Sequence, residues 1–232
     1  EDNWVKTGDR ILLADKQAAS VLEKARVESF ARISDAGDLS NTSLSHPLAG
    51  MEGSDGEWDE PRDFRAAPFV TEEDGTGFVH CAPSHGMDEF ELYRDAGMLE
   101  QVLTYNVMED GAMRADLPFF GGKRILKPNG KEGNVNAAVI EKLAESGKLL
   151  ARGKIKHSYP HSWRSKAPLI YRNTPQWFAA IDRPVGDNQD EFGKTIRERA
   201  LNSIDKMVEW TPKTGRNRLY SMIEARPDWV LS

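Results

Sequence analysis

The sequence has little cysteine, no long apolar run and no surplus of positive charge. Cys81 is its single cysteine, which excludes an internal disulfide and the zinc fingers and ribbons that need several thiolates. No apolar run approaches the roughly 20 residues that cross a bilayer. The acidic start, EDNWVKTGDR, lacks the basic and apolar regions of a signal peptide. We therefore expect no membrane association and a reducing, cytoplasmic location.

The net charge of −6 at pH 7 argues against tight, autonomous nucleic-acid binding, because such binders usually carry a basic surplus. A local basic patch for one RNA end stays compatible with this charge when other domains supply most of the affinity. The length of 232 residues fits one ordinary domain, alone or with a small appendage.

The spacing of apolar residues predicts an α+β fold rather than a regular βαβ series. Apolar residues at helical spacing, with terminal glycines or proline, predict helices at about 15–25, 87–96, 134–146, 190–201 and 216–225. Asp15 is expected to cap the first of these. Short apolar runs beside turn residues predict strands at about 11–13, 69–70 and 78–79. The stretches 37–65 and 101–127 mix Gly and Pro with short apolar runs, which indicates loops, turns and short strands.

The densest cluster of unusual residues is GTGFVHCAPSHGMDE, residues 75–89. Glycines flank Thr76, so the backbone there can turn sharply and approach a ligand closely. His80 and His85 lie on either side of a proline-containing loop. Asp88 and Glu89 open the helix that follows, where the helix dipole also stabilises carboxylates.

Three interpretations of this cluster compete. The first is a structural loop whose His and Asp side chains satisfy backbone groups. The second is a metal site formed by His80, His85 and Asp88, although the spacing is not the paired-histidine helical signature of a zinc hydrolase. The third is a metal-free ester-hydrolysis site, in which a carboxylate holds a substrate ammonium group and backbone groups position water.

Covalent catalysis and phosphate binding are less well supported. No nucleophile-elbow motif surrounds Ser84, and adjacency to His85 does not align the two for proton transfer. The lone Cys81 is expected to be a small buried hydrophobic residue. The Gly75-Thr76-Gly77 turn lacks the further glycines and the Gly-Lys-Ser/Thr of a phosphate-binding loop.

A second feature is the stretch from Lys154 to Phe178, in which cations alternate with aromatic residues. One interpretation is a core hairpin with solvated lysines. The other is an RNA-contacting wall of cations and stacking aromatic rings, with Lys154, Lys156 and Arg164 as the candidate contacts. The acidic overall charge favours the first interpretation.

At these residues the sequence resembles a known family. GTGFVHCAPSHGMDEF resembles the editing-domain signature of class I synthetases for branched aliphatic amino acids, and its Val-His-x-Ala-Pro form is similar to that of the isoleucyl-tRNA synthetases. KHSYPHSWRSKAPLIYRNTPQWF resembles the segment that returns from the inserted domain toward the catalytic core. The final RPDWVLS resembles the segment just before that core resumes. The resemblance runs in the correct order from about His46 to Ser232.

The resemblance implies a fold and a task. The fold is a compact β-barrel-like core decorated with helices, with an editing domain at 1–178 and a helical segment returning toward an absent catalytic core at 179–232. The task is hydrolysis of valine from Val-tRNA(Ile), without metal or cofactor. The implied partners are the tRNA(Ile) 3′ end that carries valine and the rest of the synthetase.

The resemblance also implies roles for individual residues. His80 lines the side-chain pocket and excludes isoleucine by bulk. The ammonium-binding Asp of the family falls at Glu89, and Asp88 stands one position earlier, so both are candidates, with Asp88 slightly preferred. Pocket or water-positioning candidates are Thr76, Gly77 and His85.

The sequence departs from the family pattern in one important respect. The threonine-rich Thr-Thr-Thr-Pro-Trp segment, which forms one wall of the editing pocket, does not occur here, and the signatures His-x-Gly-His and Lys-Met-Ser-Lys-Ser are also missing. The chain is therefore expected to be a fragment that does not activate amino acids and whose own hydrolytic activity is weak or missing.

Overall fold

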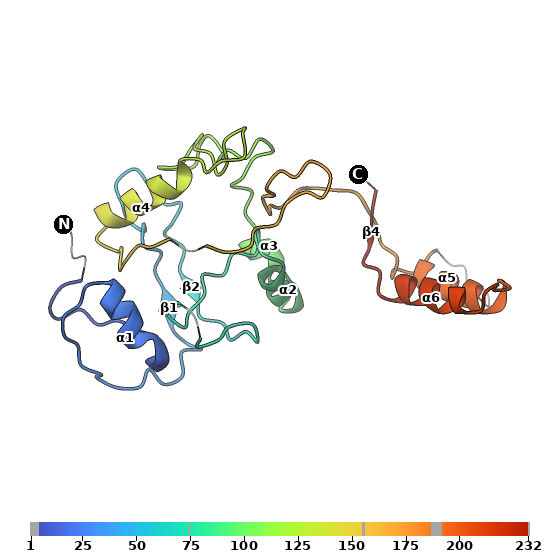
Figure 1. Cartoon of the computed structure of the whole chain (residues 1–232), viewed down its shortest axis with the longest axis horizontal. Coiled ribbons are helices and arrows are strands. Elements are labelled where there is room, and N and C mark those ends of the chain that lie inside the picture. The colour runs from blue at the N-terminus through green and yellow to red at the C-terminus, as the bar shows by residue number, and fades with distance from the viewer. Residues whose placement is uncertain (1–4, 74, 155, 187–191, 232) are drawn as a thin grey trace. The chain divides into compact units, whose positions relative to one another are not determined.

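The computed structural model describes residues 5–73, 75–154, 156–186 and 192–231, and the chain divides into two compact units, 1–173 and 174–232 (Figure 1). The first unit carries the helices α1 (Asp15–Lys24), α2 (Met87–Asp95), α3 (Leu99–Val102) and α4 (Val135–Glu145), and the strands β1 (Ser43–Leu44) and β2 (Arg62–Asp63). The second carries β3 (Phe178–Ala179), α5 (Ile196–Lys206), α6 (Thr214–Glu224) and β4 (Trp229–Val230). Within the described ranges, no helix combines the length and apolar character needed to cross a membrane.

The strands are short. β1 pairs with β2 in the antiparallel register Ser43↔Asp63 and Leu44↔Arg62, and β3 pairs with β4. The turn-rich stretch 107–132 adds only isolated bridges, such as Val107↔Met113 and Ala112↔Arg124. The structure therefore has the predicted α+β class, but the described residues form no β-barrel, because each ladder contains only one or two pairs.

Three predicted helices of the first unit are confirmed as α1, α2 and α4. α1 buries Val21 and Leu22, as the apolar spacing predicted. α2 and α4 end before Gly97 and Gly147, whose φ values of 68° and 66° lie in the left-handed region that favours glycine.

Other details of the first unit were predicted wrongly. Asp15 does not cap α1; Ala14 occupies the cap position, and Asp15 instead pairs with Arg32 at 3.0 Å. The stretches 11–13, 69–70 and 78–79 are irregular rather than strands. Their apolar runs are too short to distinguish a strand from a loop that packs side chains, as Phe78 does against Phe64 with ring centroids 5.5 Å apart.

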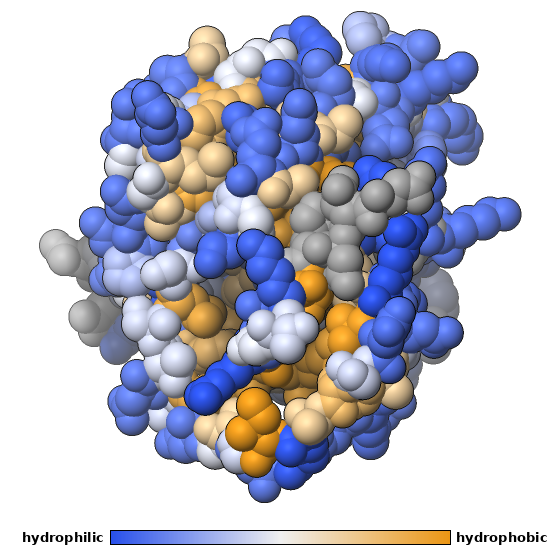
Figure 2. Space-filling model, turned by 90° about the vertical axis from the view of Figure 1, so that its left-hand side faces the viewer, coloured by the Kyte–Doolittle hydropathy of each residue, from blue (hydrophilic) through white to orange (hydrophobic). Residues whose placement is uncertain are grey.

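The core of the first unit is small. It centres on Leu48, Leu117, Phe120 and Ala138, so α4 packs against the turn-rich stretch and the loop that follows β1. No described side chain is completely buried. Figure 2 shows, on one face, apolar atoms lying in the gaps between polar side chains. This small core holds α4 and the neighbouring loops together, but no closed sheet surrounds it in the described residues.

In the second unit, α5 and α6 lie side by side (Figure 1). α5 begins at Ile196, later than the predicted start; positions 190 and 191 lie outside the described residues, and 192–195 are not helical. A capping box fixes this start: the Thr195 side chain accepts from the Glu198 N–H, and the Glu198 carboxylate accepts from the Thr195 N–H. α6 confirms the helix predicted near 216–225.

Candidate functional site

The 75–89 loop is anchored against the start of α1. The Ala14 N–H donates to the Thr76 carbonyl at 2.9 Å, and the Thr76 hydroxyl donates to the Phe78 carbonyl at 3.2 Å. Gly77 has φ of 81°, and a Cβ atom there would lie 2.3 Å from the Ala14 Cβ. The two glycines beside Thr76 are therefore explained by a sharp turn and a close backbone approach, as the sequence predicted.

The middle of the loop is fixed by two residues that contact distant segments. The Ser84 side chain is buried, and its hydroxyl accepts a hydrogen bond from the Thr104 N–H at 2.8 Å. His85 is half-buried, and its Nδ1 lies 2.8 Å from the Tyr171 carbonyl oxygen. Sequence reasoning missed both partners, because no local signal connects residues 20 and 86 positions apart.

The two candidate carboxylates stand in different surroundings at the start of α2. Asp88 is exposed, and no described residue forms a hydrogen bond or ion pair with its side chain. Glu89 is half-buried and folds back over the helix start, so that a Cβ on Gly86 would lie 1.8 Å from its Oε2. Asp88 is thus the carboxylate that is open to a ligand, whereas Glu89 is packed.

Cys81 does not have the surroundings of a nucleophile. Burial raises the pKa of its thiol, and the negative charge of Glu89 raises that pKa further. A raised pKa keeps the thiol protonated at neutral pH, and the thiolate is the reactive form. Cys81 was expected to be a small buried hydrophobic residue; it is half-buried instead, with a thiol that stays protonated.

A further histidine, His46, was not among the predicted site residues, and the charge of His80 acts on it. His80 itself is exposed. His46 stacks on Trp58 with ring centroids 4.8 Å apart, and its Nδ1 accepts from the Leu48 N–H at 3.1 Å. Burial lowers the pKa of His46, and positive charge on His80 and Arg62 lowers it further. His46 and His80 are therefore close enough to interact electrostatically.

The described side chains do not gather into a metal site. Within the described ranges, no three His, Cys, Asp or Glu side chains are grouped as metal ligands, and His80, His85 and Asp88 are not brought together in that way.

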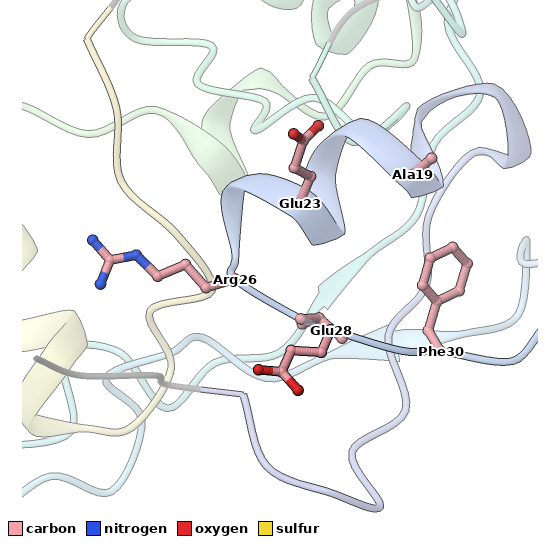
Figure 3. A pocket seen from close by; sticks show the side chains of 6 residues that line it. Ala19, Glu23, Arg26, Glu28 and Phe30 are labelled. Carbon is pink, nitrogen blue, oxygen red and sulfur yellow. The ribbon is translucent and has the colours of Figure 1, made fainter.

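Two hollows of the first unit lie away from the 75–89 loop. One, of about 450 Å³, is lined by α1 and the chain that follows it, including Glu23, Arg26 and Phe30. Its side chains diverge rather than converge on one point (Figure 3). The second, of about 270 Å³, is lined by Met108, Asp110, Leu126, Arg172 and their neighbours. Neither includes Thr76, Gly77, His80, His85, Asp88 or Glu89, so these two hollows are not the pocket expected beside the loop.

The stretch from Lys154 to Phe178, for which the sequence left RNA contact as the less favoured interpretation, contains an irregular hairpin, residues 159–171, which we call the aromatic hairpin. Tyr159 donates its hydroxyl to the Leu169 carbonyl at 2.7 Å, and the Ser162 N–H donates to the Ala167 carbonyl at 2.9 Å. At its tip, Trp163 is 78% exposed and the Arg164 guanidinium lies 5.0 Å from its ring centroid. Lys154 and Lys156 are also exposed. The stretch thus presents an aromatic ring and cations to solvent.

Comparison with known proteins places this loop and hairpin in a family. The family model for class I tRNA synthetases (I, L, M and V) matches residues 2–232. The chain therefore belongs to the class I tRNA synthetase family.

Its relatives are isoleucine–tRNA ligases. The chain is 68% identical over its whole length to the isoleucine–tRNA ligase of Ruegeria pomeroyi, and 45% identical over its whole length to that of Rhodopseudomonas palustris. It is 45% identical over 99% of its length to that of Caulobacter vibrioides. It covers 24%, 24% and 23% of these three proteins, so it corresponds to about a quarter of each ligase.

Proposed function

We propose that this chain is the editing region of a cytoplasmic isoleucine–tRNA ligase, and that it hydrolyses the ester of Val-tRNA(Ile) without a metal. The observation that carries this proposal is the 75–89 loop, whose editing-type sequence is anchored on both sides and leads into a helix start with one unpaired carboxylate, Asp88. The partners of the proposed reaction are the 3′ end of tRNA(Ile) carrying valine and the rest of the ligase.

The proposed chemistry asks little of the side chains. An aminoacyl ester is already activated, so a held ammonium group, a positioned water and donors for the developing oxyanion suffice. In this proposal Asp88 holds the ammonium group, because it is exposed and unpaired, and Glu89 is the second candidate. Thr76 and Gly77 bring backbone groups to the substrate.

The proposed specificity follows from size. One methylene separates isoleucine from valine and is worth only about 1–3 kcal/mol, a limit for which the isoleucine enzymes are the standard illustration. A second site that admits valine and rejects isoleucine supplies the missing discrimination. In this proposal His80 provides the bulk that excludes isoleucine.

The exposed tip of the aromatic hairpin favours a second candidate function, a non-catalytic insert that docks the tRNA 3′ end. Exposed aromatic rings and cations are the groups that bind unpaired nucleotides. This candidate predicts binding of a CCA-ended stem without turnover, and loss of that binding when Lys154, Lys156 and Arg164 are changed together to Gln.

The proposal is tested by hydrolysis of Val-tRNA(Ile) with a chelator present, by the chain alone and by the chain joined upstream to a threonine-rich segment. We expect turnover of Val-tRNA(Ile) and not of Ile-tRNA(Ile), and a loss of at least about tenfold for Asp88→Asn, since one charged contact is worth about 1.5–3 kcal/mol. Glu89→Gln is measured in parallel, and Asp95→Asn, at the other end of α2, is the matched control.

Four outcomes decide between the alternatives. Loss in Asp88→Asn alone assigns the ammonium group to Asp88, and loss in Glu89→Gln alone assigns it to Glu89. Full activity in both variants removes the carboxylate anchor from the proposal. Activity that disappears on chelation contradicts metal-free hydrolysis.

A further inference from the structure

The aromatic hairpin and the 75–89 loop meet at one hydrogen bond. Tyr171 ends the hairpin, and its carbonyl oxygen lies 2.8 Å from His85 Nδ1. A carbonyl oxygen only accepts hydrogen bonds, so the proton of this bond is on Nδ1. In the neutral ring Nε2 then carries the lone pair. The bond thus fixes both the position and the tautomer of His85.

A second connection lies one residue earlier. Ser84 accepts from the Thr104 N–H, and the Asn173 side-chain amide donates to the carbonyl of the same Thr104 at 3.4 Å. The loop, the chain just beyond α3 and the chain leaving the hairpin are therefore connected to one another around residues 84, 104 and 171–173. Their contacts are between distant segments, so they hold the loop in place rather than stabilise a local turn.

The tied residues lie directly before α2. The N–H groups of His85 and Gly86 both donate to the Ala82 carbonyl, at 2.8 and 3.1 Å, and Gly86 is the N-cap of α2. Asp88 and Glu89 stand in the first turn of that helix. Displacement of His85 would therefore move the helix start and both carboxylates with it.

We propose that His85 is a positioning residue, which acts through Nδ1 to join the aromatic hairpin to the 75–89 loop and thereby sets the place of the α2 carboxylates. The proposal deepens the proposed function and rests on it for its catalytic consequence. In this role His85 does not activate water through Nε2. The bond from Nδ1 to the Tyr171 carbonyl instead holds the loop at a fixed position relative to the hairpin, and so relative to RNA bound there.

Two substitutions distinguish the role of His85 Nδ1 from that of its Nε2. His85→Asn places an amide N–H close to the position of Nδ1, whereas His85→Gln places one close to the position of Nε2. Hydrogen exchange of the backbone amides of Gly86 and Phe90, which donate to the carbonyls of Ala82 and Gly86, reports the order of the helix start without any substrate. We expect His85→Gln to speed that exchange by roughly five- to tenfold, the effect of losing one ordinary hydrogen bond, and His85→Asn to keep it near the wild-type rate.

Hydrolysis of Val-tRNA(Ile) is the second measurement. We expect His85→Asn to retain a larger share of kcat than His85→Gln, with the pH profile of the wild-type chain. Equal loss of kcat in both variants with unchanged exchange would overturn the proposal, because the reaction would then need Nε2. Unchanged exchange in His85→Gln would overturn it as well. If the chain hydrolyses nothing even when it is joined to the threonine-rich segment, the proposed function fails, and the exchange result still decides whether His85 positions the helix.

The tautomer gives a spectroscopic check with an internal control. His46 Nδ1 accepts from a backbone N–H, so its neutral ring carries the proton on Nε2, opposite to His85. Long-range ¹H–¹⁵N correlation spectra near pH 8 should show the Nδ1–H form for His85 and the Nε2–H form for His46. The Nε2–H form at His85 would contradict the bond to Tyr171 and with it the proposal.

Discussion

A Cβ atom on Gly77 would lie 2.3 Å from the Cβ of Ala14, the residue that caps α1. Gly77 also has φ of 81°, a backbone conformation that is strained for any residue with a Cβ atom. We therefore expect Gly77→Ala to lower the free energy of unfolding through two effects: about 1–2 kcal/mol of backbone strain and a further 1–3 kcal/mol or so of overpacking. Urea unfolding measures the sum.

Gly75→Ala is the matched control. Gly75 has a comparable φ of 62°, and nothing lies within 4 Å of its Cβ position. It should show the strain of about 1–2 kcal/mol without the overpacking. Equal losses in the two variants would mean that α1 moves away freely and that Ala14 does not constrain the loop.

Ser84 should contribute to stability rather than to chemistry. Its buried hydroxyl accepts from the Thr104 N–H, but Thr104 is exposed, so water can replace the lost acceptor. We expect Ser84→Ala to cost about 1 kcal/mol, the net value of an ordinary hydrogen bond. Ser29→Ala, at an exposed serine, should stay within about 0.5 kcal/mol of wild type. A Ser84→Ala chain that is as stable as wild type but inactive would point instead to a nucleophile.

The sequence predicted those parts of the fold that depend on local signals. The apolar spacing of Val21 and Leu22 and the stop signals at Gly97 and Gly147 located three helices, and their burial and φ values agree. The Thr195-x-x-Glu198 capping box was present in the sequence and would have corrected the start of α5. The short apolar runs misled because a single hydrophobic pair, such as Phe64 and Phe78, orders a loop as well as a strand.

In the candidate site, too, local sequence signals predicted some features and missed those that depend on distant segments. Residue types and spacing singled out the 75–89 loop and its glycines, and the structure explains the conformation of Gly77 by a close approach to Ala14. The partners that hold the loop, Thr104 and Tyr171, are far away in the chain and join it through backbone groups that every residue has. No residue type marks such partners, so only the folded chain reveals them. The roles of Asp88 and Glu89 in catalysis stay predictions.

His46 should titrate below an ordinary histidine. Burial is the largest cause of its lowered pKa, followed by His80 and then Arg62. We expect His80→Gln to raise the pKa of His46 without restoring 6.5, and Arg62→Gln to raise it less. NMR titration of the ring protons measures both. No change in either variant would show that the three side chains do not share one electrostatic neighbourhood.

This lowered pKa has a consequence for stability. In the unfolded chain His46 takes up its proton near its ordinary pKa of 6.5, whereas the folded chain takes it up at lower pH. Protonation therefore favours the unfolded state: the contribution of neutral His46 is complete above pH 6.5 and is lost as the pH falls from there through the folded pKa. His46→Gln should remove this part of the pH dependence from urea unfolding curves.

In the second unit, Arg197 connects Asp182 to the end of α6, and we expect this connection to weaken in acid. Its guanidinium pairs with Asp182 at 2.7 Å and also donates to the carbonyls of Glu224 and Arg226, at 2.9 and 2.6 Å, at the end of α6. The hydrogen bond and charge of Arg197 lower the pKa of Asp182 below its ordinary 3.8. A depressed carboxyl pKa contributes stability above pH 3.8 and loses it as the pH falls through the folded value.

Arg197→Lys should therefore speed hydrogen exchange at the end of α6 at neutral pH, because an ammonium group cannot make the paired contacts of a guanidinium. Asp182→Asn should lower the thermal midpoint of the second unit at pH 7, and the difference from wild type should shrink as the pH falls through the lowered pKa of Asp182 and its carboxylate becomes protonated. Arg183→Lys, at an exposed arginine next to Asp182, is the control. A difference that persists unchanged at low pH would show that Asp182 acts through packing and not through its charge.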